Sequence, residues 1–272
     1  MSRPMDIVAV TNRKGGVGKS SLTTNLAAAL ALQGKRVLVI DMDSQASSTA
    51  VFLEELPASA STTAHVLVGQ ATLSDIVVPA TREGVFIAPA SRDLTAAQLS
   101  IVARTGRETI LRRALRGLEG YDLVLIDTAP EQQLATVNSL VAARHVLMPF
   151  TPDPKALEGL QTTSDAVAEI RAAELTDASV LGCVQIAHDK RLSVTDQARE
   201  QVKAAYGEAL FETRIRANSS FIVCPAWHRD IFDIERGERA PRRGSDDYRA
   251  LASEISERLG WTKEANHAQA AS

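Results

Sequence analysis

One short stretch of this sequence has the composition of a phosphate-binding loop. A glycine pair, a third glycine, a lysine and a serine follow closely in Lys14-Gly15-Gly16-Val17-Gly18-Lys19-Ser20. Glycines allow the backbone to curl so that several N–H groups point inward at phosphate oxygens. A strand-like apolar run precedes the stretch and a helical pattern follows it, which is the context that a phosphate loop requires.

The residues of this loop have distinct expected roles. Lys19 should neutralise β- and γ-phosphate oxygens, and the Ser20 hydroxyl should ligate Mg²⁺. The helix that begins near Lys19 adds the positive end of its dipole at the same place. A nucleoside triphosphate and Mg²⁺ are therefore the expected ligands, and the family resemblance described below implies that the nucleotide is ATP. The expected nucleotide contacts in the loop are Lys14, Gly15, Gly16, Val17, Gly18, Lys19, Ser20 and Ser21.

Acidic residues follow two other apolar runs. Residues 37–40 lead into Asp41 and Asp43, and residues 123–126 lead into Asp127. Open parallel sheets place their ligands at the carboxyl ends of the strands. Asp127 is therefore a candidate for the magnesium shell, through a water molecule. Asp41 and Asp43 share one face if their strand continues that far, and the alternative is that they only cap the next turn.

Apolar runs of strand length alternate with helix-period segments along the whole chain. The expected strands are 7–10, 37–40, 85–88, 123–126, 146–148, 180–186 and 210–215, and the expected helices are 19–32, 135–143, 156–173, 194–205 and 246–259. Continuous apolarity indicates strands buried on both faces. The alternation predicts an α/β fold with a doubly wound, mostly parallel sheet flanked by helices. One domain is expected over residues 1–262, with a disordered tail over 263–272.

Composition excludes several classes of protein. The 272 residues are 45% hydrophobic but only 4% aromatic, which predicts a core filled mainly by aliphatic side chains. A formal net charge of -3 excludes a protein coated in positive charge. Cys183 and Cys224 lack metal-ligand spacing, and Cys183 is expected to be buried in a strand. Without a signal peptide or an apolar run of about 20 residues, a cytoplasmic location is expected.

The loop departs from the standard P-loop pattern in a way that is typical of one family. Arg13 replaces the usual first glycine, and Lys14 stands directly before the glycine pair. These residues resemble the deviant Walker A motif of the ParA/MinD family, K-G-G-x-G-K-[ST]. In that family the first lysine reaches across a sandwich dimer to the ATP of the partner. The resemblance implies that Lys14 acts in trans, whereas the alternative is a solvated surface lysine.

Other segments resemble the ParA branch of this family over nearly the whole chain. They are Asp41-Met42-Asp43-Ser44-Gln45, a Walker B strand at residues 121–130, and residues 88–94, 136–143 and 152–160. No helix-turn-helix region precedes the loop, so the resemblance is to the short ParA types. It implies that Asp43 positions the attacking water. The implied catalytic residues are Lys14, Lys19 and Asp43, and the implied metal residues are Ser20, Asp41 and Asp127.

The chain also differs from the ParA pattern at several places. Ser44 replaces a proline that ParA proteins commonly have, and Asp127 is followed by Thr-Ala-Pro-Glu rather than by x-P-P-S. Asn218 falls where the family has an adenine-contacting Asn or Asp, although the flanking arginine is displaced. The Ser44 difference would loosen the first switch, the segment that carries Asp43. The difference after Asp127 concerns the second switch, the segment after the Walker B strand, and leaves the expected metal role unchanged. The Asn218 difference concerns the base pocket.

The resemblance implies an ATP-dependent partitioning ATPase for chromosomes or plasmids. ATP would drive formation of a homodimer that binds double-stranded DNA without sequence preference, in association with the nucleoid. A ParB-like protein would stimulate the slow hydrolysis that releases the dimer. The candidate DNA-binding residues are Lys190, Arg191, Arg214, Arg216 and Arg229. Neighbouring acids nearly cancel their charge in the sequence, so a solvated surface of mixed charge is the alternative.

Two other functions remain open at the level of sequence. A MinD-like positioning ATPase needs a basic amphipathic C-terminal helix, but the expected last helix has acids on its polar face, which anionic lipid repels. We therefore expect no membrane contact, and expect this helix to dock on the core with Trp261 beside it. A metabolic ATP-dependent enzyme on the same scaffold would need a second substrate pocket, for which no motif is found. A reductase like the nitrogenase iron protein is disfavoured, because neither cysteine matches the cluster positions.

Overall fold

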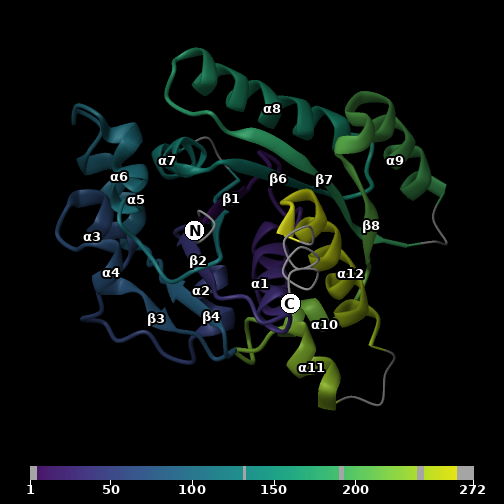
Figure 1. Ribbon diagram of the computed structural model, residues 1–272, viewed down its shortest axis with the longest axis horizontal. Helices are drawn as coiled ribbons and strands as arrows, with labels where there is room; N and C mark the ends of the chain where they lie inside the picture. Colours follow the sequence, from purple (N-terminus) through teal and green to yellow (C-terminus); the bar gives the residue numbers. More distant parts are fainter. Residues whose placement is uncertain (1–4, 131–132, 190–192, 238–241, 262–272) are drawn as a thin grey trace, which may run out of the picture.

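A single sheet forms the centre of the computed structural model, which describes residues 5–130, 133–189, 193–237 and 242–261. Within these residues the strand order is β3-β4-β2-β5-β1-β6-β7-β8 (Figure 1). The strands are β1 (Asp6–Val10), β2 (Val37–Met42), β3 (Val78–Pro79), β4 (Val85–Ala88), β5 (Leu123–Thr128), β6 (His145–Phe150), β7 (Ser179–His188) and β8 (Leu210–Arg216). Only β3 pairs antiparallel among the described strands. The predicted fold class is confirmed.

Every predicted strand is present, and one strand was missed. The missed strand is β3, which has two residues and lies at the edge of the sheet beside β4. Pro79 cannot donate to a sheet ladder, so an edge position is where such a strand is tolerated. Two residues are too few to give a hydrophobic period in the sequence.

Helices cover both faces of the sheet (Figure 1). The long helices are α1 (Lys19–Ala31), α7 (Leu134–Ala142), α8 (Ala156–Ala172), α9 (Ser193–Tyr206) and α12 (Arg243–Arg258), all of which were predicted to within three residues. The short helices are α2 (Ser47–Phe52), α3 (Thr63–Val68), α4 (Leu73–Ile76), α5 (Asp93–Ser100), α6 (Ile110–Ala114), α10 (Ser220–Val223) and α11 (Ile231–Gly237). These were not predicted, because one or two turns carry little periodic signal.

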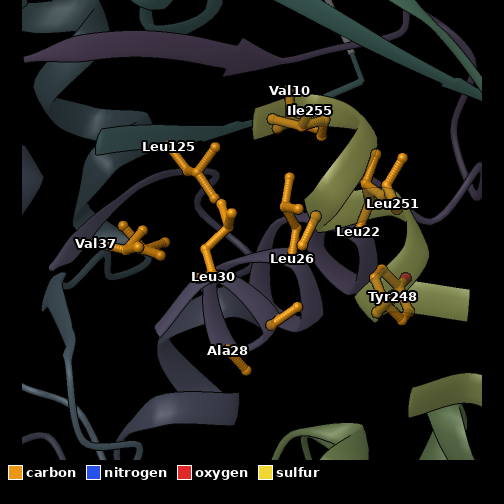
Figure 2. Close-up of a cluster of buried hydrophobic side chains, with 14 of the residues drawn as sticks. Val10, Leu22, Leu26, Ala28, Leu30, Val37, Leu125, Tyr248, Leu251 and Ile255 are labelled. Atoms are coloured by element: carbon orange, nitrogen blue, oxygen red, sulfur yellow. The ribbon is translucent and has the colours of Figure 1, made fainter. Parts of the chain in front are cut away.

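The core consists of separate clusters on the two faces of the sheet. Along β1, Val8 and Val10 contribute to the cluster with α1 and α12, whereas Ala9 contributes to the cluster with α7, α8 and α9. Successive side chains of a strand point to opposite faces, so this division follows from the extended backbone. Figure 2 shows side chains of α1, such as Leu26, between the strands and α12.

Helix α12 docks on the core, as its sequence predicted. Leu251 and Ile255 are buried against α1 and the sheet, and each such side chain contributes about 2 kcal/mol by leaving water. Trp261 follows the helix, and its Nε1 donates to Asp6 Oδ2 at 2.9 Å. None of the helices in the described part of the chain is long and apolar enough to cross a membrane. The predicted tail, residues 263–272, lies outside the described residues, and the domain limit at residue 262 stays a prediction.

Candidate active site

The glycine-rich loop is anchored to strand β6 before it turns into α1. Thr11 N donates to Leu147 O at 3.0 Å, and Asn12 Nδ2 donates to Pro149 O at 2.8 Å. Asn12 Oδ1 in turn accepts from Lys14 N at 2.9 Å. The start of the loop is therefore fixed by the neighbouring strand, at the carboxyl end of the sheet, where ligands of open α/β folds bind.

Two glycines of the loop have backbone conformations that other residues rarely adopt. Gly16 has φ +72° and Gly18 has φ +73°. A Cβ atom on Gly18 would also lie only 2.7 Å from Ile186 Cδ1 of β7. Helix α1 begins after Gly18 with no side-chain cap and no acid in its first turn. Its first N–H groups therefore have no capping side chain and are suited to bind phosphate oxygens.

The other predicted loop contacts differ in their exposure. Gly15 and Gly16 are exposed, whereas Val17 is buried. Ser20 and Ser21 are half-buried, and the Ser21 carbonyl accepts hydrogen bonds from Asn25 and Tyr248. The loop thus presents its glycine backbone outward, while Val17 fixes it to the core.

Lys19 lies inside the loop rather than on its surface. Its side chain is buried, and its Nζ donates to Lys14 O at 3.4 Å. Burial lowers the pKa of Lys19, while the nearby carboxylates of Asp127 and Asp43 act in the opposite direction. An ammonium with little solvent around it and carboxylates on one side is arranged to bind a further anionic group such as phosphate.

Asp127 ends strand β5 directly beside Asp41 of β2, because the two residues are register partners. Asp127 is fully buried, and its Oδ2 accepts from Ser48 Oγ at 2.7 Å. Burial raises the pKa of Asp127 to about 6, although hydrogen bonds from Ser20 and Ser48 lower it. Its other oxygen, Oδ1, has no hydrogen-bond partner within the described residues.

Asp41 is also fully buried, but both of its oxygens are engaged. Oδ1 accepts from Asp43 N at 3.1 Å, and Oδ2 accepts from Thr49 N at 2.9 Å and from Thr49 Oγ1 at 2.8 Å. Burial, followed by the charge of Asp127, raises the pKa of Asp41 to about 7. Asp41 therefore orients α2 and Asp43. The nearly buried Asp43 accepts from Gln45 N at 3.0 Å, on the same side as Lys19.

The residues at the carboxyl ends of β2 and β5 fit a magnesium ion bound together with phosphate. Groups of three or more His, Cys, Asp or Glu side chains able to hold a metal do not occur in the described part of the chain. Mg²⁺ does not need such a cage, because it is usually held by one or two carboxylates, substrate phosphates and waters. The unpartnered Oδ1 of Asp127 and the Ser20 hydroxyl provide this donor set.

The raised pKa values predict that the nucleotide-free protein loses stability as the pH rises. The ordinary pKa of Asp is 3.8, so the folded chain keeps these two protons at pH values where the unfolded chain has released them. Their contribution to stability is complete below about pH 4 and is lost as the pH rises to about 7. Thermal unfolding between about pH 5 and pH 8 measures this loss, which Asp127→Asn should reduce. Equal slopes in both proteins would contradict the prediction.

Lys14 is held by an acid of its own chain. Its Nζ lies 2.5 Å from Asp153 Oδ2, and the Lys14 side chain is 36% exposed. Thr151 Oγ1 and Lys155 N also donate to Asp153. Burial works against ionisation of Asp153, but the hydrogen bonds from Lys14, Thr151 and Lys155 outweigh it and lower the pKa. Lys14 is therefore an ion-paired residue at the rim of the loop, and not a freely solvated lysine.

A glycine of α8 allows the helix to approach this part of the loop. A Cβ atom on Gly159 would lie 3.1 Å from Asn12 Oδ1 and 3.5 Å from Lys14 Cβ. Thr163, one turn later, accepts from Arg13 N at 3.2 Å. Helix α8 thus supports the position from which Lys14 projects.

The basic residues predicted to bind DNA are in different environments. Arg214 Nη1 pairs with Asp196 Oδ1 at 3.0 Å. Arg216 pairs with Asp247 through both Nε and Nη2, and the Nη2 contact is 2.6 Å. Both guanidinium groups thus have acidic partners within the chain, as expected for a surface of mixed charge.

Arg229 differs from these two arginines. It is exposed, and no ion pair of its side chain is found among the described residues. Lys190 and Arg191, the remaining predicted DNA contacts, lie outside the described residues. Arg229 is therefore the described candidate whose charge is most available to phosphate.

Asn218 already has partners on both ends of its side chain. Its Nδ2 donates to Glu235 Oε1 at 2.8 Å, and its Oδ1 accepts from Ser220 N at 2.9 Å. Glu235 also accepts from the first amides of α12 at Gly244. Asn218 is thus part of the link between β8, α11 and α12, and a contact to adenine would use its remaining hydrogen-bonding capacity.

Sequence reasoning missed three residues of this site. Asp153 follows the carboxyl end of β6, so the strand-end rule that indicated Asp41 and Asp127 also applied to it. Ser48 and Thr49 bind those two carboxylates from α2. Their contacts depend on the packing of a short helix against two strands, which gave no signal in the sequence.

Comparisons with known proteins decide the family. A family model described as an AAA domain, AAA_31, matches residues 5–179. The chromosome-partitioning ATPase Soj of Thermus thermophilus is 35% identical over 253 residues, covering 93% of this chain and 96% of that protein. The chain belongs to the ParA/MinD family of P-loop ATPases.

Further relatives of this ParA-type ATPase agree with that result. The sporulation initiation inhibitor protein Soj of Bacillus subtilis is 33% identical and covers 92% of this chain and 97% of that protein. The structure of a cobyrinic acid a,c-diamide synthase from Mycobacterium smegmatis with ADP and magnesium has a TM-score of 0.81, at 26% identity, and covers 94% of this chain and 96% of that one. The predicted cofactors, ATP and Mg²⁺, agree with the ADP or ATP analogue and the magnesium bound in structures of this synthase.

Proposed function

We propose that this ATPase partitions DNA by cycling between nucleotide-bound homodimers and monomers. Two relatives named as chromosome-partitioning proteins, at 31% and 35% identity over 93% of the chain, support this role. The observation that carries it is the position of Lys14, which lies at the rim of the phosphate loop and is bound to one partly exposed acid. A lysine in this place can exchange Asp153 for a phosphate of a second protomer, because one surface ion pair is worth only about 1 kcal/mol or less.

Within one protomer, different residues would bind the phosphates, hold Mg²⁺ and orient the attacking water. The first amides of α1 and the ammonium of Lys19 would bind the phosphates, and Ser20 and Asp127 would hold Mg²⁺ through the donor set described above. When bound there, Mg²⁺ would supply positive charge to the phosphate oxygens. Asp43 accepts a hydrogen bond from the attacking water and orients it. In a sandwich dimer, Lys14 of each protomer adds a cation to the site of the other.

DNA binding is proposed for basic residues in the C-terminal part of the chain. Arg229, which has no ion pair among the described residues, is the first proposed contact. Lys190 and Arg191 are proposed contacts from the sequence alone, and Arg214 and Arg216 need to leave their acidic partners first. Two such weak surfaces in one dimer raise the apparent affinity without new contacts. This is how the nucleotide state controls DNA residence, and a ParB-like protein would shorten that residence by stimulating hydrolysis.

Retention on arbitrary duplex DNA in ATP, in ADP and in a slowly hydrolysed analogue tests this proposal. We expect retention with the analogue, little with ADP, and a steep loss with salt, because phosphate neutralisation releases counterions. Arg229→Ala should lower the salt slope by about 1, and more than Arg214→Ala does. DNA binding that ignores the nucleotide would contradict the proposal.

The similarity to a cobyrinic acid a,c-diamide synthase favours a metabolic enzyme as a second candidate. Such an enzyme needs an acceptor pocket beside the phosphate loop. A cavity of about 760 Å³ is lined by Asp6, His145 and Ser179, at the amino ends of β1, β6 and β7, which is the edge of the sheet opposite the loop. A substrate bound there could not reach the γ-phosphate, and the pocket beside the loop, lined by Arg13, Lys14 and Gly159, has a volume of only about 220 Å³. The partitioning role is the better supported one, because the chromosome-partitioning ATPase is 35% identical to this chain and the synthase 26%.

A further inference from the structure

We infer that His228 is a positioning residue for ATP hydrolysis, because it holds the helix that binds the carboxylates of the candidate active site. The inference rests on the proposed role of Asp127 in the magnesium site. It concerns α2, which follows Asp43 in the chain, and the segment between α10 and α11, which lies about 180 residues later. Neither the family match nor any motif in the sequence pointed to His228.

Helix α2 is too short to be stable alone. It has six residues, its N-cap Ala46 is in the left-handed region at φ 53°, and no side chain caps its first turn. Isolated helices shorter than about 12 residues are marginal in water. The position of α2 must therefore be set by its tertiary contacts.

The first turn of α2 contacts both buried carboxylates. Ser48 Oγ donates to Asp127, and Thr49 donates to Asp41 through both its backbone N and its Oγ1. Asp41 in turn accepts from the backbone of Asp43. A shift of α2 would therefore change three acids of the site together.

The last turn of α2 is held by two other segments. A helix leaves the carbonyl groups of its last turn without partners inside the helix. Here Ala50 O lies 2.7 Å from His228 Nδ1, and Phe52 O accepts from Thr81 N at 3.0 Å. Because a carbonyl oxygen can only accept, Nδ1 of His228 carries the proton and donates it.

His228 adopts a strained backbone conformation to make this bond. Its φ is 53°, in the left-handed region that glycine occupies without steric cost. Such outliers persist where the surroundings determine them, and they occur preferentially at functional sites. The next residues are well anchored, because Arg229 N donates to Cys224 O and Arg82 binds Asp230 through two bonds of 2.7 and 2.9 Å. The segment that carries His228 is thus anchored by these bonds, and the His228 side chain contacts α2.

This segment and the preceding helix α10 each carry a large exposed apolar side chain, Trp227 and Ile222. Trp227 is 60% exposed and Ile222 is 79% exposed. His228 therefore connects a surface of the C-terminal part with the last turn of α2 through its side chain. Removing its imidazole should loosen α2 without creating a cavity in the core, because His228 is only half-buried.

Three variants distinguish a positioning role of His228 in ATP hydrolysis from a contribution to the stability of the fold alone. His228→Gly removes the donor and relieves the backbone strain, so its thermal midpoint should be unchanged or higher. His228→Asn keeps an N–H donor at the same bond count and tolerates the left-handed region. Glu174→Gly is the matched control, because Glu174 also has a positive φ of 56° but is exposed and outside the active site.

Hydrogen exchange of the α2 amides in the nucleotide-free protein gives the first measurement. Exchange at Ala50 and Leu53 should be about fivefold faster in His228→Gly, as expected for one lost hydrogen bond. The rate should return to that of the wild type in His228→Asn and stay there in Glu174→Gly. Wild-type exchange in His228→Gly would overturn the inference.

The Mg²⁺ dependence of ATP hydrolysis gives the second measurement. The half-saturating Mg²⁺ concentration should rise about fivefold in His228→Gly and return in His228→Asn. An unchanged value in His228→Gly, with a raised value in Asp127→Asn, would show that α2 does not position the site and would overturn the inference. If Asp127→Asn also leaves the value unchanged, the proposed magnesium role of Asp127 is wrong, and the exchange experiment alone decides whether His228 holds α2.

Discussion

Lys14→Ala is expected to reduce partner-stimulated ATP hydrolysis by about 10³-fold while ATP binding is retained. The fall follows from the loss of a cation that reaches the phosphates only when two protomers close, and cations inserted in this way are worth about 10³ to 10⁵ in rate. Retention of binding follows from the structure, because Lys19 and the α1 amides do not depend on the Lys14 side chain. Single-turnover hydrolysis and binding of a fluorescent ATP analogue measure the two effects separately.

A mixing experiment tests whether Lys14 acts in trans. Lys14→Ala and Asp43→Asn protomers should each be inactive alone, but a mixed dimer contains one site with Asp43 and a lysine from the partner. We therefore expect the mixture to regain part of the activity. Full activity of Lys14→Ala alone, or no recovery in the mixture, would contradict action in trans.

The ion pair between Lys14 and Asp153 suggests a second variant, which removes the acid and keeps the lysine. Asp153→Asn removes the charge that holds Lys14 in the monomer while the side chain keeps its size. ATP-dependent dimerisation should therefore become about fivefold tighter, as expected for the loss of one partly exposed competing ion pair. Sedimentation in ATP and Mg²⁺ measures this change, and weaker dimerisation would show that Asp153 supports Lys14 rather than restrains it.

Lys19→Ala is expected to abolish ATP binding and hydrolysis in every protomer. Lys19 is the buried cation closest to both Asp127 and Asp43, so its removal leaves carboxylates facing the position of the phosphates. Binding phosphate there would place like charges together in a poorly solvated site, and we expect a loss of at least about 10²-fold in affinity. ATP with Mg²⁺ should no longer raise the thermal midpoint.

An exposed lysine provides the control for this variant. Lys203→Ala, on α9, changes the net charge by the same amount at a solvated position and should keep the ATP-induced shift. A normal shift in Lys19→Ala would mean that the amides of α1 alone account for nucleotide binding.

The sequence predicted those parts of the fold that carry a repeated local signal. Strands buried on both faces, such as residues 123–126, are continuous apolar runs, and helices such as residues 156–173 extend over several turns. The short helices α2 to α6 have no such period. Their positions depend on contacts with distant residues, as the bond between Ala50 and His228 shows.

In the candidate site too, the contiguous residues were predicted, whereas contacts between distant residues were not. The loop at residues 14–20 is contiguous, so its chemistry could be read directly from residue types. The partner of Lys14 could not, because Asp153 is 139 residues away and meets it only after β6 and β1 pair. The charges of Arg214 and Arg216 were available in the sequence, but their neutralisation by Asp196 and Asp247 was not.

The bond between Trp261 and Asp6 has a practical consequence for labelling this protein. It places the last described residues next to the first strand, at the amino end of β1. A fluorescent protein fused after residue 261 would therefore lie at the amino end of β1, which is the opposite edge of the sheet from the loop, α2 and Lys14. Movement of the tagged molecule in living cells could then be followed without an obstacle at the surface of the proposed dimer.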